Sequence, residues 1–211
     1  AVALRERSSK IAFAKTLLHE MVHFKSYNAL QITIGDTPVL GGYRLGLLVA
    51  ERVGDLAYFK NLNEATTEEL TRRIFEKVVI NRLFDKEIEQ TRKIIAENPL
   101  AENKFGEELF NQDTIFVEVE DGEFYKGAVN ELWGILFGSN RIIFTERFAY
   151  KQERKILNTL IDKMFERNLD KFKDREEIFE LFVEGMMTGN ILPVGRLIEN
   201  TFGKGTLRKI G

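Results

Sequence analysis

The chain has 211 residues, of which 44% are hydrophobic and 30% are charged, and it contains no cysteine. This composition is typical of a globular protein with room for one large domain or two small ones. The formal net charge of −2 lacks the basic surplus of nucleic-acid-binding proteins, so we expect no nucleic-acid partner. The absence of cysteine excludes disulfides, thiol catalysis and thiolate metal sites.

The sequence also bears on location in the cell. No apolar run approaches the roughly 20 residues that a membrane-spanning helix needs, and no signal peptide is visible. The absence of cysteine fits a reducing compartment, which favours a cytoplasmic location. Because the chain enters a helical pattern almost at once, we expect that a further segment precedes Ala1. The oligomeric state is left open by the sequence.

The first predicted element is a helix over Arg7 to Asn28, where apolar residues recur mostly at spacings of three and four. It contains both histidines of the chain, in the H-E-x-x-H segment His19-Glu20-Met21-Val22-His23. Residues four apart share one face of a helix, so the two imidazoles can bind one zinc ion. Glu20 beside them can accept a proton from an attacking water as a general base. The alternative is a pair of ordinary helix histidines.

A catalytic zinc ion normally has three protein ligands, so the chain must supply one more. The continuation H-E-x-x-H-x-x-G-x-x-H is excluded, since Ser26 and Ala29 stand where its glycine and third histidine would be. We therefore expect a carboxylate, and the best candidates are Glu64 and Glu68, four apart at the start of a second predicted helix. One would bind zinc and the other would support a ligand. The next candidates are Asp36, Glu51 and Asp55.

The segment between the two motifs is predicted to be rich in β-structure. A short strand at Leu30–Ile34 is followed by a turn, and strand-like runs at Tyr43–Glu51 and Leu56–Asn61 predict a hairpin. Tyr43 and Tyr58 in this hairpin are candidates to stabilise the oxyanion of a hydrolytic reaction, because no other donor is evident. In the alternative interpretation these tyrosines only pack.

The two motifs together resemble those of the gluzincins, the thermolysin-like zinc peptidases, in which H-E-x-x-H is followed on a later helix by N-E-x-x-x-D. The second motif here is Asn63-Glu64-Ala65-Thr66-Thr67-Glu68, and the resemblance covers roughly residues 16 to 70. It implies a zinc ion held by His19, His23 and Glu64, with Glu20 as the general base. It also implies that Glu68, in place of the family's aspartate, supports a histidine ligand, with Asn63 beside it.

The same two glutamates have a simpler interpretation. They would be solvated residues at a helix start that is capped by Asn63, where negative charge is favoured by the helix dipole.

The rest of the chain is predicted to be mainly helical. Helices are expected at Thr66–Arg82 and Asp85–Ala96, a linker near residues 98–106, a strand at Thr114–Glu120 with a turn at Asp121-Gly122, and a helix at Val129–Phe137. Further helices are expected at Phe148–Asn168, Arg175–Met187 with Asp174 as cap, and Leu192–Thr201, with Gly189 and Gly203 ending segments before a frayed basic C-terminus.

We therefore predict an α+β fold, mainly α, with a zincin-like helix–β-hairpin–helix metal site in residues 1–100 and a bundle-like helical region in residues 104–211. The predicted function is zinc-dependent hydrolysis of a peptide or protein substrate. One alternative is a non-catalytic interaction module with a structural or vestigial zinc site. Another is a zinc hydrolase with a non-peptide substrate. Access of water to the metal separates a catalytic from a structural centre.

Overall fold

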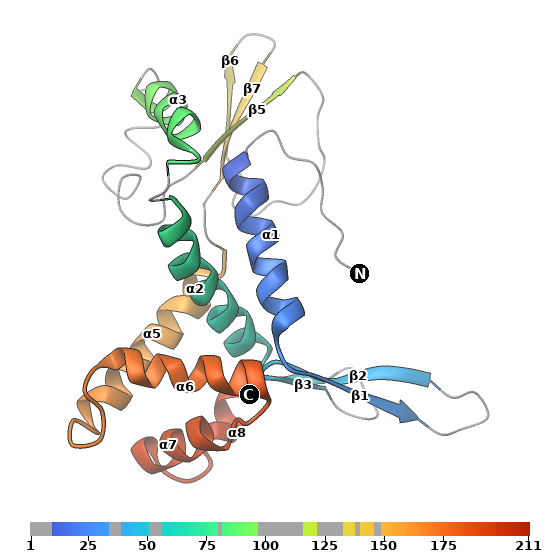
Figure 1. Ribbon diagram of the computed structural model, residues 1–211, viewed down its shortest axis with the longest axis vertical. Coiled ribbons are helices and arrows are strands. Elements are labelled where there is room, and N and C mark those ends of the chain that lie inside the picture. The colour runs from blue at the N-terminus through green and yellow to red at the C-terminus, as the bar shows by residue number, and fades with distance from the viewer. Residues whose placement is uncertain are drawn as a thin grey trace. The chain divides into compact units, whose positions relative to one another are not determined.

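The computed structural model describes residues 10–33, 39–50, 56–79, 82–96, 116–121, 133–137, 140–145 and 149–211 (Figure 1). These residues are mainly helical and include two antiparallel sheets, which confirms the predicted mainly helical α+β class. In this part of the chain no helix combines the length and apolar character that crossing a bilayer requires.

The described helices are α1 (Lys10–Lys25), α2 (Lys60–Val79), α3 (Asp85–Ala96), α5 (Lys151–Glu166), α6 (Arg175–Thr188), α7 (Leu192–Phe202) and α8 (Thr206–Ile210). One sheet contains, in chain order, strands β1 (Asn28–Thr33), β2 (Val39–Leu45), β3 (Leu48–Ala50) and β4 (Ala57–Tyr58). The other contains β5 (Phe116–Asp121), β6 (Trp133–Phe137) and β7 (Asn140–Thr145) in the order β5-β7-β6. The four-stranded sheet thus joins α1 to α2 along the chain.

The chain forms two compact units. One consists of Ala1–Glu20 and Arg72–Ala149, and the other of Met21–Thr71 and Tyr150–Gly211. Each unit therefore combines segments from both of the regions into which the sequence was expected to divide.

The first unit has a small core at the beginning of α1. Ile11 and Phe75 are buried there, and the ring of Phe75 stacks on that of Phe84 with centroids 5.8 Å apart. The Glu87 carboxylate of α3 accepts hydrogen bonds from the backbone N–H groups of Lys10, at 3.1 Å, and Ile11, at 3.3 Å. N–H groups in the first turn of a helix have no partner within the helix. A residue of α3 therefore stabilises the beginning of the described part of α1.

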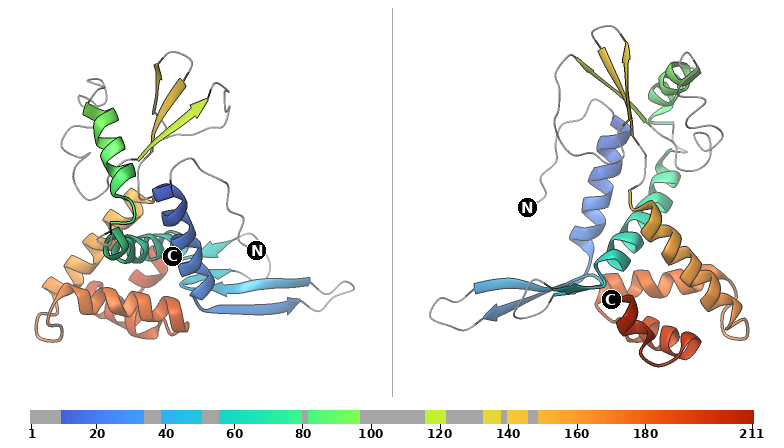
Figure 2. Two further views of the ribbon diagram at one scale, coloured as in Figure 1. Left: turned by 45° about the horizontal axis from the view of Figure 1, so that its top comes forward. Right: turned by 180° about the vertical axis from the view of Figure 1, so that it is seen from behind.

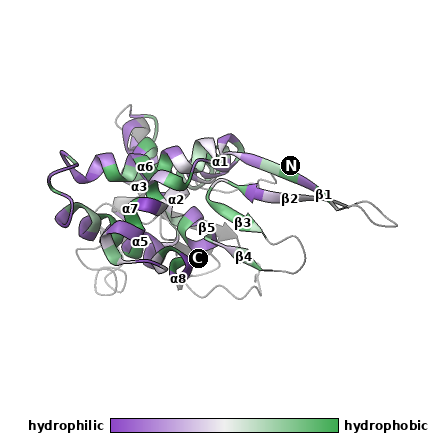
Figure 3. Cartoon of the chain, turned by 90° about the horizontal axis from the view of Figure 1, so that it is seen from below, coloured by the Kyte–Doolittle hydropathy of each residue, from purple (hydrophilic) through white to green (hydrophobic). Residues whose placement is uncertain are grey.

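The second unit has its core among the C-terminal helices. Helix α6 packs on both α5 and α7, and hydropathy colouring shows hydrophobic and hydrophilic residues on each of these helices (Figure 3). The buried apolar residues are Leu157, Ile161, Met164, Ile178, Phe179, Phe182, Met186, Val194, Leu197 and Ile198. The β1–β2 hairpin projects away from the helices of this unit (Figure 2).

Helix ends in the second unit follow the sequence closely. The Asp174 carboxylate accepts hydrogen bonds from the N–H groups of Glu176 and Glu177 at the start of α6, which confirms the predicted cap. Gly189 ends α6 in the left-handed conformation, also as predicted. The expectation of a frayed C-terminus is wrong, because Thr206–Ile210 form α8 and the Glu199 carboxylate accepts hydrogen bonds from backbone N–H groups at its start.

A tight turn between β2 and β3 positions the beginning of α2. The Leu47 N–H donates to the side-chain oxygen of Asn63 at 2.9 Å, and the Gly46 N–H donates to the Tyr27 carbonyl at 2.7 Å. Gly46 has φ 61°, and a Cβ atom there would lie 2.5 Å from the Asn63 oxygen, so only glycine fits. The Tyr27 N–H in turn donates to the Met186 carbonyl at 3.0 Å. This turn, the residues after α1 and helix α6 are therefore joined by hydrogen bonds.

This arrangement corrects the prediction for the second helix. Helix α2 begins at Lys60, earlier than expected, and the predicted strand Leu56–Asn61 is reduced to β4. Asn63 lies within α2 and is buried, so it is not a helix cap. Its side-chain oxygen instead accepts the hydrogen bond from the Leu47 N–H.

The region before α5 differs more strongly from the sequence-based expectation. Trp133–Phe137, expected in a helix, form strand β6, and Asn140–Thr145 form the central strand β7, which pairs with both β5 and β6. Gly134 disfavours a helix, whereas the apolar and aromatic residues around it suit a sheet. The predicted linker at residues 98–106, residues 122–132 and the candidates Asp36, Glu51 and Asp55 lie outside the described residues.

We predict that Asn63→Ala lowers the free energy of unfolding by about 1 to 3 kcal/mol, because the buried Leu47 N–H loses its acceptor. Denaturant unfolding in the presence of a chelator measures this change. The control is Asn61→Ala, an exposed position in the same helix, which should change stability by less than about 0.5 kcal/mol. Equal effects of the two substitutions would contradict a stabilising role for the Asn63–Leu47 hydrogen bond.

Candidate metal centre

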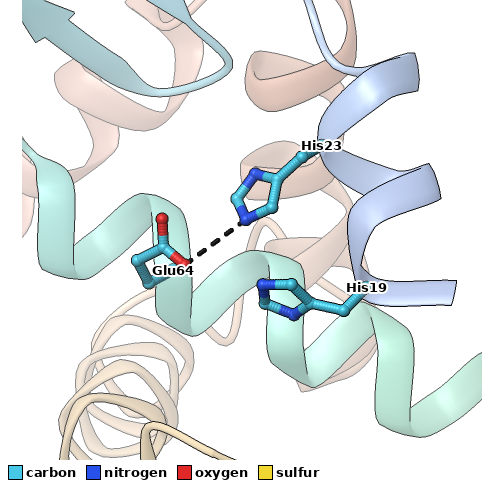
Figure 4. Close-up of side chains that lie close together, drawn as sticks. All are labelled: His19, His23 and Glu64. Atoms are coloured by element: carbon cyan, nitrogen blue, oxygen red, sulfur yellow. Dashed lines mark ion pairs between the residues drawn. The ribbon is translucent and has the colours of Figure 1, made fainter. Parts of the chain in front are cut away.

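Two imidazoles and one carboxylate converge on facing sides of α1 and α2. His19 and His23 extend from α1 toward α2, which carries Glu64 (Figure 4). Each of the three residues offers one ligand atom, and these atoms lie within 4.8 Å of one another. The structure thus brings together the three residues that the sequence indicates as ligands, and the group could hold a metal ion.

The closest pair in this group has the spacing of metal ligands. The distance between His23 Nε2 and Glu64 Oε2 is 3.3 Å. Two ligand atoms about 2.1 Å from a tetrahedral zinc ion are about 3.4 Å apart. The positions of these two side chains therefore fit a shared tetrahedral ion without a large movement.

The carboxylates on this side of α2 are shielded from solvent. The Glu64 side chain is 15% exposed and Glu68, one helical turn later, is fully buried. The interpretation of the two as solvated charges at a helix start is therefore wrong. Glu69 is also buried, and its carboxylate lies 3.7 Å from the guanidinium of Arg154 in α5. Negative charge gathered in a poorly hydrated place favours the binding of a cation.

Tyr150 is a member of this site that sequence reasoning missed. Its phenol donates a hydrogen bond to the Glu64 carboxylate. Burial raises the pKa of Tyr150 from 10.0 to about 12, together with the charge of Glu64, this hydrogen bond, and the charges of Glu68 and Glu153. The phenol is therefore protonated at neutral pH and acts as a donor.

Tyr150 is the residue that immediately precedes α5, and its backbone conformation is unusual. Its backbone has φ 55° and ψ 39°, a left-handed conformation that bulky residues rarely adopt. Its carbonyl accepts the first hydrogen bond of α5, from the Arg154 N–H at 2.8 Å. Tyr150 is separated by much of the chain from the two segments that carry the candidate ligands, and it belongs to no motif. No local pattern in the sequence therefore indicated its role.

The other predicted site residues occupy less distinctive places. Glu20 lies beside His19 on α1 and is half-buried. Tyr43 on β2 is 39% exposed and Tyr58 on β4 is 37% exposed. Glu20 as general base and the two tyrosines as oxyanion donors stay predictions.

Comparisons with known proteins add nothing to this geometry. No family model matches the chain, and no curated protein or solved structure is significantly similar to it. A function must therefore be inferred from the residues of the site itself.

In the metal-free protein we expect Tyr150 to ionise near pH 12 rather than near pH 10. Because the folded protein holds this proton more tightly than the unfolded chain, the resulting stabilisation is complete below pH 10 and is lost as the pH rises from about 10 to about 12. The difference in unfolding free energy between wild type and Tyr150→Phe should fall across this window. Phenolate absorbance, compared between the two proteins, reports the ionisation itself, and ionisation of Tyr150 at or below pH 10 would contradict the prediction.

Proposed function

We propose that the protein is a zinc-dependent hydrolase that cleaves peptide bonds, with His19, His23 and Glu64 as the zinc ligands. The observation that carries the proposal is the convergence of these three side chains, with His23 and Glu64 3.3 Å apart. A set of two imidazoles and one carboxylate, with a fourth position left for water, is a common ligand set of catalytic zinc. A peptide substrate is supported by the resemblance of both motifs to those of the gluzincins.

The ligands also fit zinc by their chemistry. Imidazole nitrogen and carboxylate oxygen are ordinary zinc ligands, and the chain has no thiolate that would compete. When bound, zinc would polarise the substrate carbonyl and lower the pKa of a water molecule in its open position.

The residues of the chain have separate tasks in this reaction. His19 and His23 bind as neutral imidazoles, so both must release any proton before the ion is taken up. Glu20, next to His19, accepts the proton of the attacking water and passes it to the leaving amine. Glu68 lies on α2, one turn after Glu64, and is buried. From there it orients one of the two histidine ligands of α1. In these roles Glu20 affects turnover, whereas Glu64 and Glu68 affect metal binding.

Solvent exposure favours a catalytic over a structural centre. The side chains of His23 and Glu64 are 27% and 15% exposed, and the convergent group among the described residues has three members. A structural zinc site is normally closed by four protein ligands, whereas a catalytic one keeps a position for water. This observation supports hydrolysis over a non-catalytic interaction module.

We predict that the purified protein binds about one zinc ion per chain and that Glu64→Ala weakens zinc binding more than about 100-fold, because two imidazoles alone hold the ion poorly. Elemental analysis gives the stoichiometry and competition with a chelator gives the affinity. Glu76→Ala, a more exposed glutamate of α2, is the matched control and should bind zinc like the wild type. If Glu64→Ala retains wild-type affinity, the third ligand lies elsewhere.

Glu20→Gln should retain zinc and fold while peptide cleavage falls by about 10² to 10⁴-fold, because the amide preserves the shape of the side chain but cannot accept the proton of water. Mass spectrometry of a peptide library after incubation with zinc-loaded protein measures cleavage. Wild-type turnover by the variant would exclude Glu20 as the general base. Zinc uptake with no cleavage by the wild type would instead favour a non-peptide substrate or a non-catalytic centre.

A further inference from the structure

The hydrogen bond between Tyr150 and Glu64 connects the metal centre to the C-terminal helices. Glu64 Oε2 lies 3.3 Å from His23 Nε2, and the Tyr150 phenol donates to the same carboxylate. A carboxylate has two oxygens, and a ligand that is not held can rotate or bind an ion through both. A donor that holds a carboxylate removes part of this freedom before the ion arrives.

An ion pair near the start of α5 helps to keep the donor in place. Arg154, one helical turn after Tyr150, is buried and pairs with the buried Glu69 of α2. The first turn of α5 is therefore attached to α2 at Glu69 through Arg154 and at Glu64 through Tyr150. Tyr150 also has a backbone conformation that is unfavourable for a tyrosine. Residues in such conformations are concentrated at functional sites, where the surrounding structure maintains them.

We propose that Tyr150 is a positioning residue of the metal centre, which holds one oxygen of Glu64 so that the carboxylate offers only its other oxygen to the ion. This inference rests on the proposed function, because it requires Glu64 to be a ligand. It assigns a role in metal binding to the start of α5, where the sequence indicated no site residue. Partners that orient a ligand typically change metal affinity or activity by about 10 to 100-fold.

The test compares Tyr150→Phe with the wild type in zinc affinity, measured by competition with a chelator. The phenylalanine keeps the ring and removes the donor, so zinc should bind about 10 to 100-fold more weakly. The matched control is Tyr27→Phe, which removes a phenol of similar exposure in the same unit, 37% against 39% for Tyr150, and should leave affinity unchanged. Unfolding of each protein in chelator reports any loss of structure separately.

A second measurement uses cobalt in place of zinc, because its visible spectrum depends on the number of ligand atoms. In Tyr150→Phe the released carboxylate should bind through both oxygens, so the spectrum should change from that of a four-coordinate ion to that of a five-coordinate ion. Replacement of Tyr150 by 4-aminophenylalanine restores an N–H donor and should restore both affinity and spectrum. A residue with a purely structural role would not show this rescue.

The outcomes separate this inference from the proposed function. If the wild type binds neither zinc nor cobalt, the proposed function fails and the inference fails with it. If the wild type binds zinc and Tyr150→Phe binds it equally well with an unchanged cobalt spectrum, the inference is overturned while the metal centre stands. If Tyr150→Phe is unfolded in chelator, the folded 4-aminophenylalanine variant decides, and failure of that variant to reproduce wild-type affinity and spectrum overturns the inference.

Discussion

The hydrogen bond from the Leu47 N–H to the Asn63 side chain is the constraint on which the geometry of the candidate metal centre depends. Both groups are buried, so the bond cannot be replaced by one to water without rearrangement. Asn63 immediately precedes Glu64, and the same turn contacts Tyr27, four residues after His23. The turn at Gly46 and Leu47 therefore binds both Tyr27, which follows His23, and Asn63, which precedes Glu64. These two hydrogen bonds constrain the distance between His23 and Glu64.

The electrostatics of α2 have a second consequence. Glu68 and Glu69 are buried in a helix whose neighbouring turn carries Glu64, and burial of carboxylates is costly unless opposite charge or hydrogen-bond donors surround them. Arg154 supplies a charge for Glu69, and Tyr150 supplies a donor for Glu64. A divalent cation bound between Glu64 and the imidazoles would add further positive charge next to these carboxylates. Binding of the proposed metal ion would therefore also stabilise the fold.

The C-terminal helices thus have a part in the site. Met186 of α6 accepts from the backbone after α1, and its sulfur accepts a hydrogen bond from the Thr67 hydroxyl of α2 at 3.4 Å. The first turn of α5 contacts the Glu64 carboxylate through Tyr150. The candidate ligands lie in the first third of the sequence, whereas Tyr150 and Met186, which contact the segments carrying them, lie in the last third. The C-terminal helices therefore contact the segments that carry the candidate ligands.

The sequence by itself determined the features that depend on local spacing. Two histidines four apart share a helix face wherever that helix lies, and a capping aspartate or a left-handed glycine acts within one turn, so α3, α6 and the imidazole pair could be predicted. Only the tertiary structure decided the role of Asn63, the burial of Glu68, the strand β7 and the contact of Tyr150 with Glu64. Each of these depends on a partner distant in the sequence, and such a partner leaves no periodic pattern. The spacing of two carboxylates in the sequence does not indicate whether they are solvated or buried, because burial depends on the segments that pack over them.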